Sequence, residues 1–438
     1  MKGRALIAGT AAVTAAAVLA LGGVFRHGSA ATAASDVLPS SVAAELAKGF
    51  SAGDTQAEVA GLQAELRLNP HDVKALGTLG LAYQQRVRET GDPTYYTKAD
   101  GILHRALALA PRDLIATAGL GQLALSRHQF RHALAIGRRA RAISPTTAGV
   151  YGIIGDAEVE LGRYRDAFRA FDRMAAIKPD VASYARVSYA RELRGDVTGA
   201  ERAMELAGSS AVGEREPSSW THVQLGLLYL GHSHPGLALR ELRLALALDP
   251  SYYVALDGMA QVQASLGHLR TALAYERQAV DRVPLPAQVG LLGDLYRAVG
   301  NRSAASREYA LIDVIERLLA ANGVRNDLDV ALFDVDHGMR LAHALVLARK
   351  GYAERPSVVG DDVLGWALAR NGRCTAALPW SQRSLRLGTR DAVKYFHRGM
   401  IERCLGHDAD AGVWFRRALT LNPRFSVVWA PVARRYAR

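Results

Sequence analysis

The sequence has only two cysteines and lacks the short motifs that mark common catalytic sites. Its 438 residues contain no phosphate-binding glycine loop, no GxSxG nucleophile turn, no HExxH metal motif and no cysteine pair at zinc spacing. These absences argue against an enzyme, a bound cofactor and a dedicated small-molecule substrate. Charged residues, at 22%, are balanced by 49% hydrophobic residues, so the composition predicts a folded chain.

Potential metal ligands occur in three pairs, each without the further ligands that a metal site needs. The pairs are His128 with His132, His232 with His234, and Asp334 with His337. Roles in turns and helix caps account for such residues, so we expect no metal.

The formal net charge is +12, but the basic residues do not gather in one segment. Short runs such as Arg138-Arg139 and Arg416-Arg417 lie inside Ala/Leu-rich stretches, where a helix would turn them towards solvent. We therefore expect a solvated face and no nucleic-acid partner. The alternative is an Arg-rich face that binds an anionic envelope polymer or a membrane surface.

The N-terminal 33 residues have the pattern of an export signal. Lys2 and Arg4 precede an uncharged run over residues 5–25, and Ala31 to Ala33 offers a small-x-small cleavage site. The run is also about the ~20 residues that cross a bilayer, so an uncleaved signal anchor is the alternative. Either way, we expect the rest of the chain outside the cytoplasmic membrane, secreted after cleavage near Ala33 or held by residues 5–25.

A repeat of 34 residues dominates the remainder. Pro111, Pro145 and Pro179 follow at that interval, and a small residue precedes an alanine by twelve positions in six places, as in Gly226 and Ala238. The fullest copy is HVQLGLLYLGHSHPGLALRELRLALALDP, ending at Pro250. This pattern resembles the tetratricopeptide repeat (TPR) family.

The resemblance implies an all-α fold: a right-handed α-solenoid of about ten helix-turn-helix repeats with helical caps. We expect a linker and cap over residues 34–71, repeats 1–7 over 72–323, repeats 8–10 over 324–424 and a capping helix over 425–438. Leu332 stands where the eighth repeat should have a glycine at its helix crossing, so the packing of that repeat is in doubt.

In the TPR family the first helix of each pair lines a concave groove, which binds a protein or peptide. The register of the glycines then gives the candidate groove residues, mostly polar with an apolar patch near the C-terminus. They are Gln84, Gln122, Asp156, Glu160, Tyr189, Gln261, Asp294, Arg297, Trp366, Phe396 and Met400. Trp366 and Phe396 either anchor a partner or are buried by curvature of the superhelix. We expect a non-enzymatic scaffold at the bacterial cell envelope, with a partner that the sequence does not identify.

The two cysteines occupy adjacent helices in this register. Cys374 begins the second helix of the ninth repeat, and Cys404 ends the first helix of the tenth. Antiparallel packing brings these ends to one edge of the solenoid, within reach of a disulfide that an oxidising compartment would preserve. The alternative is a pair of unrelated small core residues.

Overall fold

The computed structural model describes residues 55–437, which form helices α3 to α24 and no strand within that range. The predicted export signal and residues 34–54 of the predicted cap lie outside the described residues. Among the described helices, none has the length and apolar character that crossing a membrane requires.

Ten helix pairs follow the first helix, α3 (Thr55–Leu68), and a short helix, α24 (Trp429–Tyr436), ends the stack. Pairs 1 to 5 are α4 (Val73–Thr90) with α5 (Thr94–Leu109), α6 (Leu114–Ser126) with α7 (Phe130–Ile143), α8 (Ala148–Glu160) with α9 (Tyr164–Ile177), α10 (Val181–Leu193) with α11 (Val197–Ser210), and α12 (Arg215–Gly231) with α13 (Pro235–Leu248). Pairs 6 to 10 are α14 (Tyr253–Leu266) with α15 (Leu269–Arg282), α16 (Pro286–Ala298) with α17 (Arg302–Ala321), α18 (Asp327–His337) with α19 (Leu341–Glu354), α20 (Val358–Arg370) with α21 (Cys374–Ser384), and α22 (Ala392–Cys404) with α23 (Asp408–Leu421). The predicted all-helical solenoid of about ten pairs is confirmed.

The small residues of the repeat lie where the two helices of a pair cross. A β-carbon on Gly226 would lie 3.1 Å from the Leu242 side chain and 3.3 Å from the Ala238 carbonyl oxygen. A larger residue would push the helices beyond the ~8–10 Å of close packing. The eighth pair forms despite Leu332, which is buried, because Gly351 on α19 supplies a close approach against Leu328.

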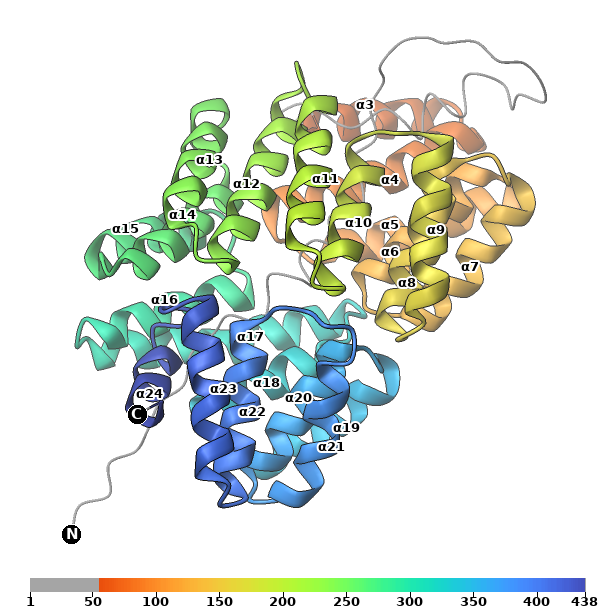
Figure 1. Cartoon of the computed structure of the whole chain (residues 1–438). Helices are drawn as coiled ribbons and strands as arrows, with labels where there is room; N and C mark the ends of the chain where they lie inside the picture. The colour runs from red at the N-terminus through yellow and green to blue at the C-terminus, as the bar shows by residue number, and fades with distance from the viewer. Residues whose placement is uncertain (1–54, 438) are drawn as a thin grey trace.

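The solenoid turns back over itself and forms two stacked tiers (Figure 1). The first tier runs from α3 to α15 and the second from α16 to α24. Successive first helices pack together from α4 to α14 and again from α18 to α22, whereas α16 packs mainly against α15 and α17. The break in this packing at α16 lies where the chain passes from one tier to the next.

The tiers meet through turns. Hairpin turns inside the first-tier pairs contact the loops that link pairs of the second tier, roughly 190 residues later in the chain. The Tyr164 hydroxyl accepts a hydrogen bond from the Val358 amide at 2.6 Å, and Asn422 donates to the Leu230 carbonyl at 3.0 Å.

Two glycines make this close contact of turns possible. Gly162 and Gly195 have φ of +70° and +74°, in the left-handed region that favours glycine. A β-carbon at these positions would overlap the carbonyl oxygens of Pro356 and Gly388 in the second tier. The same residues therefore form the hairpins and admit the neighbouring tier.

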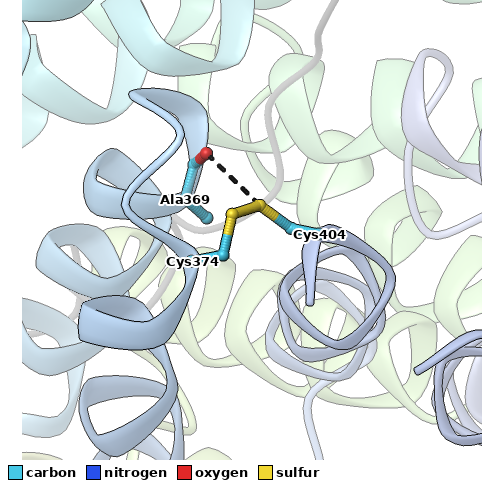
Figure 2. Close-up of a disulfide and its surroundings, with 3 residues drawn as sticks. All are labelled: Ala369, Cys374 and Cys404. Atoms are coloured by element: carbon cyan, nitrogen blue, oxygen red, sulfur yellow. Dashed lines mark hydrogen bonds between the residues drawn. A yellow bond between two sulfur atoms is a disulfide. The ribbon is translucent and has the colours of Figure 1, made fainter. Parts of the chain in front are cut away.

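A disulfide joins Cys374 and Cys404, which come from the neighbouring helices α21 and α22 (Figure 2). Their Cα atoms are 5.7 Å apart, and the Cys404 sulfur lies 4.0 Å from the Ala369 carbonyl oxygen. The register of the repeats therefore placed the two cysteines correctly at one edge of the stack.

Candidate functional site

The structure places the eleven candidate groove residues on the first helices, but it does not leave them open to solvent. Gln84, Asp156, Glu160, Tyr189, Asp294, Trp366 and Phe396 are buried. Gln122, Gln261, Arg297 and Met400 are half-buried. The predicted open polar groove is therefore wrong at these positions, because neighbouring helices and the second tier cover them.

Polar members of this set bond to protein rather than facing a partner. Asp156 accepts two hydrogen bonds from Arg186, at 2.9 and 2.6 Å, which tie α8 to α10. Burial raises the pKa of Asp156, and the guanidinium opposes that rise. Gln84 donates to the Gly119 carbonyl at 3.1 Å and ties α4 to α6 in the same way.

Glu160 forms a buried ion pair with Arg355, a residue of the second tier. The Arg355 Nη2 donates to one carboxylate oxygen at 3.1 Å, and its Nε donates to the other. Glu160 is 2% exposed and Arg355 is 4% exposed. The ion pair between Glu160 and Arg355 therefore holds the two tiers together.

The C-terminal aromatic residues form a core. Of the two alternatives left open for Trp366 and Phe396, the structure shows burial: they are 1% and 0% exposed. The Trp366 indole donates to Asp336 at 2.8 Å and stacks on His397 with ring centroids 4.6 Å apart. Neither ring can anchor a partner, because α24 and the neighbouring helices enclose both.

A polar network lies at the start of the second tier, around α16. Asp294 accepts hydrogen bonds from the Tyr309 hydroxyl at 2.7 Å and from His337 Nε2 at 2.9 Å. Burial alone would lower the pKa of His337, but the Asp294 carboxylate raises it above its ordinary value. This network connects α16, α17 and α18, where the packing of first helices is interrupted.

Members of two of the three pairs of potential metal ligands take ordinary roles. His128 Nδ1 contacts the Arg325 carbonyl at 3.2 Å, His132 is exposed, and Asp334 accepts from Arg340 at 2.7 Å. Among residues 55–437, the one group of three close potential ligands is Glu402, His407 and Asp410. The Glu402 carboxylate is already hydrogen-bonded to His407 and Arg398, so these protein contacts account for it.

An apolar face on α17 is exposed, and sequence reasoning missed it. Leu311, Val314 and Leu318 are 37%, 43% and 53% exposed and recur at helical spacing, so they form one stripe. We call these three residues the α17 face. Part of the signal was present in the sequence: α17 has 20 residues, six more than α15 or α13, and Leu318 lies in its last six residues.

Basic residues are exposed on the second helices α7 and α9. Arg139, Arg141, Arg165 and Arg173 are all exposed there. None of these four forms an ion pair with another residue of the described chain, in contrast to Arg169, which contacts Asp166. We call these four residues the arginine face.

Comparisons with known proteins find weak similarity to solved structures. The sequence matches no protein-family model, and no curated protein is similar to it. Among solved structures, the pilus biogenesis factor PilW has 18% identity and a TM-score of 0.39 over 46% of this chain and 92% of its own. A tetratricopeptide repeat protein from Parabacteroides merdae has 17% identity and a TM-score of 0.35 over 58% and 96%. Human IFIT1 has 15% identity and a TM-score of 0.45 over 84% and 87%. At these values the likeness is one of fold alone.

Proposed function

We propose that this chain is an exported, non-enzymatic scaffold that binds a protein partner through the α17 face. The observation that carries the proposal is the stripe of Leu311, Val314 and Leu318, whose side chains are 37%, 43% and 53% exposed. Contiguous exposed apolar residues on a helix are a common site of protein association, because covering them removes apolar surface from water.

Burial of the candidate groove residues favours the α17 face over the groove as the binding surface. Residues of the groove are occupied by contacts such as Asp156 with Arg186 and Glu160 with Arg355. A partner would have to break those contacts to enter, whereas the α17 face needs no rearrangement. The extension of α17 by six residues adds about 9 Å of helix on which a partner can lie.

Substitution on the α17 face tests the proposal. Val314→Lys combined with Leu318→Lys should abolish the crosslink to one specific protein in intact cells, and it should leave the melting temperature unchanged because both residues are exposed. Val346→Lys is the matched control, since Val346 is 59% exposed on α19. The proposal would be contradicted if the wild type, the double variant and the Val346→Lys control all captured the same protein.

Export is supported by the N-terminal pattern and by the Cys374–Cys404 disulfide, which an oxidising compartment preserves. N-terminal sequencing of the protein recovered outside the membrane should begin near Ala34. A chain that starts at Met1 in the membrane fraction would establish the signal anchor instead.

A second candidate function rests on the arginine face, which fits an anionic envelope polymer or membrane surface. Binding to vesicles that contain anionic lipid should then fall steeply between about 0.05 M and about 0.5 M salt, because exposed charges are screened. Arg139→Gln with Arg173→Gln should weaken it further. Binding through the α17 face should respond little to salt.

A further inference from the structure

A cavity of about 180 Å³ lies between the two tiers, where α10 and α12 face α20 and α22. A single buried water needs roughly 10–15 Å³ on this measure, so the cavity is large enough for a molecule of several non-hydrogen atoms. It is smaller than the roughly 300–1,000 Å³ of sites for drug-sized ligands. Its size therefore suits a compact metabolite.

Three polar side chains on the cavity wall make no hydrogen bond within the described residues. Tyr189, Gln224 and Lys394 are 5%, 7% and 7% exposed and line the cavity. Within residues 55–437, neither the hydroxyl, the amide nor the ammonium group has a hydrogen bond or an ion pair. None of these three polar groups is among the buried unpartnered atoms of the described residues, so each one is open to the cavity and available to a ligand that enters it. Three such groups on one wall indicate a site for a polar ligand.

His232 adds an acceptor to the same wall. Its Nδ1 lies 2.8 Å from the Leu228 carbonyl oxygen and must donate to it, so Nε2 carries a free lone pair. That Nε2 is buried and has no partner in the described chain. Burial also lowers the pKa of His232, which keeps the imidazole neutral near pH 7.

The wall carries charges of both signs. Lys394 and the exposed Arg390 are cationic, and Glu192, Asp391 and Asp362 are acidic, with Asp362 already bonded to His397. Burial, together with the nearby Asp391, raises the pKa of Glu192 to about 7, while Lys394 opposes the rise. A pure anion or a pure cation would leave one set of charges unmatched. A ligand with separated opposite charges would match both.

The remaining wall is apolar. It includes Met204, Leu227, Leu228, Val363 and Phe425. An aliphatic group would bury its surface against these side chains and gain the usual hydrophobic stabilisation.

We propose that this cavity binds a free α-amino acid with an aliphatic side chain. The carboxylate contacts Lys394, with Tyr189 and Gln224 as further donors. The ammonium group donates to Glu192 and to Nε2 of His232, and the side chain lies on the apolar wall. The sequence had predicted no small-molecule ligand, because these groups come from helices about 200 residues apart and only the stacking of tiers unites them.

Calorimetry with L-leucine and three analogues of similar size tests the proposal on the intact protein. The analogues are 4-methylpentanoate, which lacks the amine, 3-methylbutan-1-amine, which lacks the carboxylate, and N-acetyl-L-leucine, which imitates the last residue of a peptide. L-leucine should bind with a Kd of about 1 mM or tighter and raise the melting temperature. Each analogue should bind at least about tenfold more weakly, as expected when a charge-assisted hydrogen bond is lost.

Two variants assign the binding to the cavity. Lys394→Met should weaken L-leucine binding by about 10- to 100-fold, and Glu192→Gln, which keeps the side-chain shape, should weaken it by a similar factor. Lys350→Met, at an exposed lysine of α19, is the control and should have no effect. The proposal is overturned if L-leucine does not bind, if 4-methylpentanoate binds as well, or if both cavity variants bind L-leucine like the wild type.

Discussion

The ion pair between Glu160 and Arg355 gives the sharpest test of the stacked tiers. Both side chains are almost fully buried, and their α-carbons belong to different tiers. Replacing Glu160 by Gln leaves the Arg355 guanidinium buried without the Glu160 carboxylate. Replacing Arg355 by Met likewise leaves the Glu160 carboxylate buried without the guanidinium. Each single substitution should therefore cost about 3–5 kcal/mol. The double variant should cost much less than the sum, because neither charge is then left unpaired.

Hydrogen exchange measures this effect locally. The Val358 amide is bonded to the Tyr164 hydroxyl across the same contact between tiers. A loss of about 3 kcal/mol should accelerate exchange in the segment that contains Val358 by roughly 100-fold, if opening is local. Exchange within helix pair 1, far from the contact, is the internal control. Single variants that exchange like the wild type, or a double variant that costs the sum of the singles, would refute the reasoning.

Other perturbations test the core, the buried carboxyl groups and the disulfide. Trp366→Ala should lower the free energy of unfolding by about 3–5 kcal/mol, since the ring is fully buried; a wild-type denaturation midpoint would contradict its role in the core. Burial, reinforced by Asp257, raises the pKa of Glu276 well above its ordinary value, so the folded state holds an extra proton and the wild type loses stability as pH rises above about 4.5. Glu276→Gln should therefore stabilise the protein at pH 8 but not at pH 4, and denaturation curves at both values will show whether the gain depends on pH. Replacing Cys374 and Cys404 by Ser should cost about 3–4 kcal/mol, because the bond closes a loop with a sequence separation of 30; an unchanged unfolding midpoint under non-reducing conditions would argue against that contribution.

Contacts between neighbouring repeats could be predicted from the sequence. Gly226 and Ala238 fix which faces of two helices meet, and the same spacing places Cys374 near Cys404. Each of these contacts lies within one or two periods of the chain, so the repeat itself encodes it. The packing of the eighth helix pair could not be predicted from Leu332 alone, because Gly351 on α19 allows the close approach of the two helices.

Contacts between tiers could not be predicted. A 34-residue period does not specify how many repeats complete one turn of the superhelix, and so it does not specify that Glu160 meets Arg355. Much of the contact also uses backbone groups, such as the Val358 amide and the Leu230 carbonyl, which carry no side-chain signal. The burial of Trp366 and the existence of the cavity between the tiers depend on this higher-order packing. Neither could therefore be predicted from the repeat pattern of the sequence.

Stacking of the tiers also imposes an order on folding. An open solenoid has only contacts between neighbours, so it can nucleate at any repeat and grow in both directions. Here Arg355, Thr389 and Asn422 reach partners about 190 residues earlier in the chain, and those partners exist only after the first tier has formed. Synthesis from the N-terminus delivers that tier first, and each later linking loop then closes onto a finished hairpin turn. Moving the chain start to the beginning of the second tier by circular permutation should therefore slow folding without altering the final contacts.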